Sequence, residues 1–251
     1  MLESFDISVE DRQIALDMGL PYLFSYENGA YCSGPMLQTA EWFNLYLKPK
    51  GFHMSETRLS KEEVCPFLQK NIPAMLGLAV SPQGKHAFVC IEVGMEGKRY
   101  CFLNNKPQNS PDPESICLTR EDLLPLLDDS VTVAVLQKSR PMATDLKPYF
   151  QKSADTLLML KQDIRSFCCK EQTPQALRAA QNPLFRAILL DGITMLELLG
   201  NEALRKALQT VQREFLNALK ENKTLILADR ISIERFESAI DAYRDMILNL
   251  T

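Results

Sequence analysis

The spacing of apolar residues divides the chain into two regions with different periods. In the first region, residues 73–80, 86–93, 100–103 and 131–136 form short runs rich in apolar and β-branched residues, with turn-forming residues between them. Such runs predict β-strands. A turn at residues 95–98 predicts a hairpin that joins the strand 86–93 to the strand 100–103. We therefore expect a small antiparallel sheet in this part of the chain.

Helical signals lie between these strands. Apolar residues between 36 and 47 fit a helix of about four turns that ends before Pro49. Ser60 and Glu63 have the spacing of a capping box, which predicts a helix over the next residues. Thr119 has the same place before a short helix over residues 120–127. The first region is therefore predicted to be α+β, with helices inserted between its strands.

The second region shows only helical spacing. Its last segment is the clearest, because apolar residues recur there at alternating steps of three and four; they are Ile233, Phe236, Ile240, Tyr243, Ile247 and Leu250. This period is typical of an amphipathic helix. The β-branched runs stop after Pro141, which indicates a domain boundary. We predict an α+β domain over residues 1–140 and a helical bundle over residues 141–251.

Composition and charge exclude several classes of protein. The chain has 251 residues, of which 46% are hydrophobic and 24% charged, and its net charge is −4. Its basic residues are scattered among acidic ones, so no basic surface for nucleic acid is expected. No apolar stretch has the length of a signal peptide or a membrane span. We expect a cytoplasmic protein that binds neither nucleic acid nor a membrane.

Cysteine usage argues against both a disulfide framework and a metal site. The chain has seven Cys, and most lie inside apolar patterns. This predicts reduced thiols. Six of the seven are interpreted as core residues, namely Cys65, Cys90, Cys101, Cys117, Cys168 and Cys169. No C-x-x-C pair, phosphate loop or dinucleotide motif occurs in the sequence, so neither a metal nor a cofactor is expected.

Cys32 is the exception among the cysteines. It lies in the stretch 29–38, where a Gly-containing turn is predicted to become a helix. The positive end of a helix dipole and the free N–H groups there favour a thiolate over a thiol. Cys32 is therefore our candidate nucleophile.

The predicted hairpin contains a candidate base and candidate orienting groups for this thiol. His86, one of only two histidines, begins the strand 86–93, and Asn104 and Asn105 follow the strand 100–103. In a hairpin, the start of one strand lies beside the end of the next, so His86 and the Asn pair are expected to be neighbours. A cysteine nucleophile needs both a base and a group that orients the base. Asn104 is favoured for the orienting role, and Asn105 is the alternative.

This order of motifs resembles the papain-like cysteine peptidases, especially the bacterial double-glycine leader peptidase-like group. The resemblance covers roughly residues 20–138 and is carried by four segments, which are residues 32–35, 85–89, 102–105 and 118–135. In that group the nucleophile sits in a Cys-Gly-Pro run that opens a helix, whereas this chain has Cys32-Ser33-Gly34-Pro35. The resemblance implies a papain-like fold with a Cys-His-Asn triad made of Cys32, His86 and Asn104.

Two further features bear on the activity that the resemblance implies. The family carries a glutamine about six residues before the cysteine as an oxyanion donor, and this chain has Tyr26 there. Asn28 is the alternative donor. A papain-like domain followed by a helical domain also resembles the butirosin-pathway acyltransferases, in which an acyl group is transferred from a carrier protein.

Three hypotheses follow for the function. The first is a cysteine-dependent amide or peptide hydrolase, or an acyltransferase, whose helical domain binds a carrier or partner protein. Its substrate would be a peptide or an acyl donor. The second is an inactive papain-like module that binds a peptide or a partner protein. The third is a scaffold in which Cys32 has no chemical role.

Overall fold

The computed structural model describes residues 1–5, 7–81, 84–104 and 114–251. The chain forms two compact units, each made of two segments of sequence. The sheet unit contains Met1–Val9 and Thr39–Thr144, and the helical unit contains Glu10–Gln38 and Asp145–Thr251. The fold is therefore α+β, as the sequence predicts, and the break after Thr144 lies close to the predicted boundary at 140. The prediction placed residues 10–38 in the first domain, whereas here they belong with the C-terminal helices.

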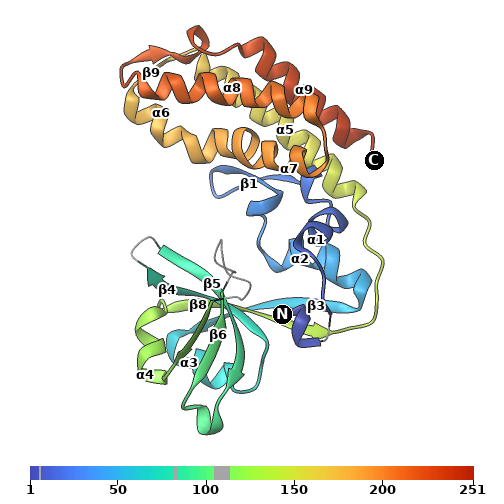
Figure 1. Cartoon of the computed structure of the whole chain (residues 1–251), viewed down its shortest axis with the longest axis vertical. Coiled ribbons are helices and arrows are strands. Elements are labelled where there is room, and N and C mark those ends of the chain that lie inside the picture. Colours follow the sequence, from blue (N-terminus) through green and yellow to red (C-terminus); the bar gives the residue numbers. More distant parts are fainter. Residues whose placement is uncertain (6, 82–83, 105–113) are drawn as a thin grey trace. The chain divides into compact units, whose positions relative to one another are not determined.

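The sheet unit is built on six antiparallel strands in the order β3-β8-β4-β5-β6-β7. Figure 1 shows these strands together with the helices of the same unit. The strands are β3 (Phe52–Ser60), β4 (Ala74–Ser81), β5 (Gly84–Val93), β6 (Tyr100–Leu103), β7 (Ser115–Leu118) and β8 (Ser130–Lys138). The helices are α2 (Ala40–Leu47), α3 (Lys61–Leu68) and α4 (Arg120–Leu123). The predicted hairpin of β5 and β6 is confirmed by their antiparallel pairing.

One face of this sheet packs on α3 and forms the core of the unit. Alternate residues of the central strands point into this core, as the period of two in a strand requires. The buried cluster includes Val64, Leu68, Leu76, Phe88, Tyr100, Phe102 and Val133. The start of α3 is fixed by the predicted capping box, because Glu63 accepts hydrogen bonds from both the backbone N–H and the hydroxyl of Ser60 at 2.8 Å.

Strand β3 is the last strand on its side of the sheet, and helix α2 covers part of its backbone. The side chain of Asn44 accepts a hydrogen bond from Met54 N–H and donates one to Met54 C=O, both at 2.8 Å. This two-way amide bridge has the donor and acceptor pattern of a neighbouring strand. It satisfies backbone groups that a sheet edge would otherwise leave unpaired.

Strands β6 and β7 are joined by a disulfide between Cys101 and Cys117. The expectation of reduced thiols is therefore wrong for this pair, which the register places directly opposite each other. Cys101 is buried as expected, whereas Cys117 is exposed and is not a core residue. Cys169 is also not a core residue, because it is exposed. The core interpretation is confirmed for Cys65, Cys90 and Cys168, which are buried.

The helical unit contains long helices that bury the predicted apolar stripes. Its helices are α1 (Asp11–Asp17), α5 (Lys147–Cys168), α6 (Pro174–Ala180), α7 (Ile193–Leu198), α8 (Glu202–Lys220) and α9 (Ile233–Leu248). Its strands are β1 (Phe24–Glu27), β2 (Ala30–Ser33), β9 (Glu171–Gln172) and β10 (Leu225–Ile226). Figure 1 shows α9 running beside both α5 and α8. The stripe of α9 is buried from Ile233 to Ile247, whereas Leu250 lies beyond the helix and is exposed.

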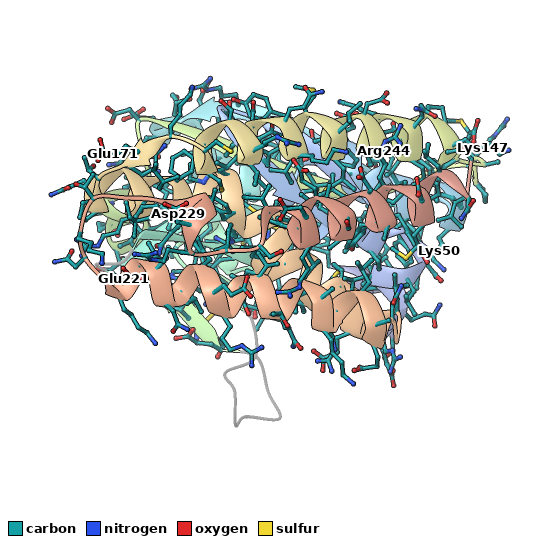
Figure 2. All side chains as sticks on the ribbon, turned by 90° about the horizontal axis from the view of Figure 1, so that it is seen from above. Lys50, Lys147, Glu171, Glu221, Asp229 and Arg244 are labelled. Carbon is teal, nitrogen blue, oxygen red and sulfur yellow. A yellow bond between two sulfur atoms is a disulfide. The ribbon has the colours of Figure 1, made fainter. Side chains whose placement is uncertain are left out.

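Polar contacts tie the ends of these helices to each other. Arg230 donates to Glu221 at 2.9 Å, and so links the end of α8 to the connection that leads into α9. Figure 2 shows Glu221 and Asp229, which precedes Arg230, at the same end of the bundle. On α9 itself, Arg235 donates to Glu214 of α8 at 2.8 Å. Exposed ion pairs add little to the stability of a protein, so the main effect of these pairs is on the register of α8 against α9.

Candidate functional site

Cys32 lies in a β-hairpin and not at the start of a helix. Strand β1 pairs with β2, and Cys32 is opposite Ser25. The two residues of the turn, Asn28 and Gly29, both have positive φ values, 51° and 81°. An Asn-Gly pair with these angles is the favoured two-residue hairpin turn. The predicted step from turn to helix at Cys32 is therefore wrong.

The residues after Cys32 also fail to form the expected helix. Gly34–Met36 is a single 3-10 turn, and α2 begins only at Ala40. Gly34 is required for packing, because a Cβ at this position would overlap the carbonyl group of Leu20. The Gly-Pro pair therefore has a structural explanation within the helical unit.

The hairpin is held by helix α5 of the same unit. The Tyr31 hydroxyl donates to the Asp163 carboxylate at 2.6 Å. Phe24 N–H donates to the buried Ser153 hydroxyl at 2.9 Å. These contacts, made across more than a hundred residues of sequence, explain why residues 10–38 fold with the C-terminal helices.

The surroundings of Cys32 disfavour the thiolate. Burial is the largest cause that raises the pKa of Cys32, and the carboxylates of Glu27 and Asp191 raise it further. The Arg186 guanidinium acts in the opposite direction but does not reverse the shift. A helix N-terminus would have lowered this pKa. The thiol is partly exposed, and its Sγ lies 3.8 Å from the carbonyl oxygen of Ala30.

Arg186 and Asp191 are residues that the sequence did not single out. They belong to a helical run that follows α6 and includes two π-helical segments, Gln181–Phe185 and Ala187–Gly192. Arg186 Nε lies 3.3 Å from the carboxylate of Asp191, which is buried. Pro183 lies inside this run, where the wider π-helical turns accommodate it. A proline within a helical pattern was the available signal for this irregularity.

His86 and Asn104 lie in the sheet unit, whereas Cys32 and Asn28 lie in the helical unit. His86 is exposed on β5 and pairs with Leu78 of β4. Both histidines of the chain, His53 and His86, belong to the sheet unit. The helical unit therefore has no imidazole of its own to serve Cys32.

Asn104 directly follows β6. Val89 pairs with Leu103, so continuing this register by one residue puts Asn104 opposite Phe88 and diagonal to His86. Diagonal neighbours on a sheet are about 7–8 Å apart at Cα. The side-chain amide of Asn104 donates to the Glu114 carboxylate at 3.1 Å, and its backbone N–H donates to the Glu114 carbonyl at 2.8 Å. The role of Asn104 in orienting His86 stays a prediction, and Asn105 lies outside the described residues.

The two candidates for the oxyanion donor also lie on the hairpin. Tyr26, which stands where the resembling family has glutamine, is 49% exposed, and its ring centroid lies 4.8 Å from that of Tyr31. Asn28 is exposed in the turn, at the end of the hairpin away from Phe24 and Ser33. Cys32 is separated from this turn by two residues of β2, Ala30 and Tyr31.

Comparison of the chain with protein-family models and with curated proteins found no match in either case. Within residues 1–5, 7–81, 84–104 and 114–251, no helix has both the length and the apolar character needed to cross a membrane. In that same part of the chain, no three or more His, Cys, Asp or Glu side chains are grouped so that they could hold a metal ion.

Proposed function

We propose that the chain is a cytoplasmic papain-like module that binds a peptide or a partner protein without using Cys32 as a catalytic nucleophile. The observation that carries this proposal is the environment of the Cys32 thiol. It lies in a strand, its pKa is raised, and its own structural unit contains no histidine. The thiolate is the attacking form of cysteine, and here burial and two carboxylates oppose it.

The residue before Gly34-Pro35 supports the same conclusion. In the resembling peptidases the nucleophile directly precedes Gly-Pro, and in this chain that residue is Ser33. Ser33 is 1% exposed, and its hydroxyl has no hydrogen-bond partner among the described residues. A serine hydroxyl attacks a carbonyl only when an adjacent base removes its proton. A buried Ser33 without such a base favours a binding role for this fold.

The helical unit offers apolar surface for a partner. Large apolar side chains that are more than a third exposed occur on several of its elements; they are Leu16, Tyr26, Leu158, Met159, Leu190, Leu216, Ile226 and Leu250. Single exposed apolar residues are normal on a protein surface. Eight of them in one unit support, as part of the proposal, a protein or peptide as the bound partner.

The second candidate is the cysteine-dependent hydrolase or acyltransferase, with Cys32, His86 and Asn104 as its triad. It is favoured by the accessibility of two members, because Cys32 is partly exposed and His86 is exposed. Its substrate would be a peptide amide or an acyl donor, and a carrier protein would be the partner.

One experiment separates the two candidates. The full chain is incubated with a fluorogenic peptide library and, separately, with a broad electrophilic probe for cysteine hydrolases. Retention on a peptide array is measured in parallel for the same protein and for Cys32→Ala. We expect both proteins to retain the same peptides equally, and we expect these peptides to be recovered uncleaved. Labelling by the probe should be the same in the wild type and in His86→Ala. Cleavage or acyl transfer that is lost in both Cys32→Ala and His86→Ala would overturn the proposal and establish the enzyme.

A further inference from the structure

The disulfide of the sheet unit joins two residues that face each other across neighbouring strands. Cys101 of β6 pairs directly with Cys117 of β7. Asn104 N–H donates to the Glu114 carbonyl at 2.8 Å, which makes that opposed pair a hydrogen-bonded one. Hydrogen-bonded and non-hydrogen-bonded pairs alternate along antiparallel strands, so Cys101 and Cys117 form a non-hydrogen-bonded pair. Such pairs have the closer Cα atoms, and here the distance is 4.1 Å.

The two cysteines of this disulfide differ in exposure. Cys117 is exposed, whereas Cys101 is only 8% exposed. Strand β7 ends the strand order of the sheet on its side, so no described strand covers it. A thiolate in solution can therefore reach Cys117 more readily than Cys101, and access decides which sulfur is attacked.

Apart from the disulfide, β7 is weakly held. Its described strand partner is β6, and its residues alternate between exposed and partly buried. Ile116 and Leu118 are partly buried against the core, and no residue of β7 is fully buried. Strands with few buried contacts open at low free-energy cost. The covalent bond to Cys101 therefore contributes much of what keeps β7 in the sheet.

The two strands that the disulfide joins also contribute to, or lead into, a polar pocket of the same unit. The pocket has a volume of about 410 Å³ and is lined by residues that include Gln69, Tyr100, Thr119, Arg120 and Glu121. Tyr100 directly precedes Cys101, and the residues Thr119–Glu121 follow the end of β7. The disulfide thus joins β6, which contributes Tyr100 to one wall of the pocket, to β7, which leads into the Thr119–Glu121 wall.

We propose that Cys101 and Cys117 form a reversible thiol–disulfide exchange site whose redox state controls the docking of β7 and the wall of the adjacent pocket. The reductant is a dithiol. One of its thiolates attacks Cys117 Sγ, the bond between the two cysteine sulfurs breaks, and Cys101 leaves as a thiolate that then takes a proton. The second thiol of the reductant, as a thiolate, attacks the mixed disulfide and releases Cys117. The two cysteines gain two electrons and two protons, and the dithiol becomes a disulfide.

The test uses the full chain, first oxidised with glutathione disulfide and then divided. One half is reduced with dithiothreitol, and both halves are followed by thiol alkylation with mass spectrometry and by amide hydrogen exchange. We expect Cys101 and Cys117 to become alkylated only after reduction. We expect exchange in residues 115–121 to rise by roughly tenfold or more, because the loop that the bond closes regains its freedom. Exchange in β4 should stay unchanged.

Two variants test whether the change in exchange depends on this disulfide. Cys117→Ser should show the fast exchange of the reduced protein without any reductant, and reoxidation should not reverse it. Cys169→Ser, which removes an exposed thiol of the helical unit, is the matched control and should behave as the wild type. Free thiols at both positions after oxidation would overturn the proposal. Equal hydrogen exchange in residues 115–121 before and after reduction would also overturn the proposal. This comparison uses the wild-type chain, so it does not depend on the folding of a variant.

Discussion

Replacing Asn44 by alanine removes the two-way amide bridge between α2 and β3. Asn44 is 7% exposed and Met54 is 6% exposed, so the bridge is shielded from water. Its two hydrogen bonds are both 2.8 Å long. Asn44→Ala leaves a buried N–H and a buried C=O unsatisfied at Met54. Each such group costs about 1–3 kcal/mol, so we expect the free energy of unfolding to fall by about 2–6 kcal/mol.

The fluorescence of one tryptophan reports this loss of stability. Trp42 is the only tryptophan of the chain, and it is buried in α2, two residues before Asn44. Its fluorescence in urea therefore follows the unfolding of the sheet unit. The matched control is Glu41→Ala, an exposed substitution on the same helix, which should change stability by no more than about 0.5 kcal/mol.

A second substitution tests the direction of each hydrogen bond. In Asn44→Asp, the carboxylate still accepts from Met54 N–H, but its second oxygen faces the Met54 carbonyl oxygen without a proton between them. Protonation restores that proton, so we expect the stability of this variant relative to wild type to rise as the pH falls. A loss below about 1 kcal/mol for Asn44→Ala, or a pH-independent difference for Asn44→Asp, would refute the reasoning.

Two more predictions concern single contacts. Tyr31→Phe removes the hydrogen bond to Asp163 and should destabilise the helical unit by about 1.5–3 kcal/mol in a thermal unfolding experiment followed by circular dichroism; an unchanged midpoint would contradict this. Hydrogen bonds from the Ser60 backbone and hydroxyl lower the pKa of Glu63. Their stabilisation is complete above the unfolded pKa near 4.3 and is lost as the pH falls through the lower folded pKa. Glu63→Gln should weaken this acid dependence of the urea midpoint, and an equal dependence would show that the capping box does not cause it.

The elements that the sequence predicted well are those fixed by local pattern. The stripe from Ile233 to Ile247 is one face of α9, and the capping box of Ser60 and Glu63 starts α3. The hairpin of β5 and β6 turns at Met95–Gly97, near where the polar residues indicated it. In each case a few neighbouring residues specify the element, and the tertiary contacts favour the same element.

The elements that the sequence did not predict depend on contacts between distant residues. Residues 10–38 join the helical unit because Tyr31 bonds Asp163 and Tyr243 donates to the Pro21 carbonyl at 2.7 Å. No local pattern contains that information. The disulfide is similar, because the pairing of Cys101 with Cys117 follows from a register that exists only in the assembled sheet.

The difference at Cys32 has another origin, because two local signals compete there. Asn28-Gly29 is a strong hairpin signal, and the structure follows it. Gly34-Pro35, soon after Cys32, is also typical of the start of a helix. Neither flanking strand contains a β-branched residue, so the strand signal rests on Phe24, Tyr26 and Tyr31 alone.

The most direct measurement of the central claim is the pH profile of iodoacetamide labelling at Cys32. Labelling is followed by mass spectrometry in the full chain, and the exposed Cys169 serves as the reference thiol. We expect Cys32 to label with a midpoint above the value near 8.5 of an ordinary thiol, and we expect this midpoint to be unchanged in His86→Ala. A midpoint well below 8.5 that rises in His86→Ala would contradict the account and make Cys32 an activated nucleophile.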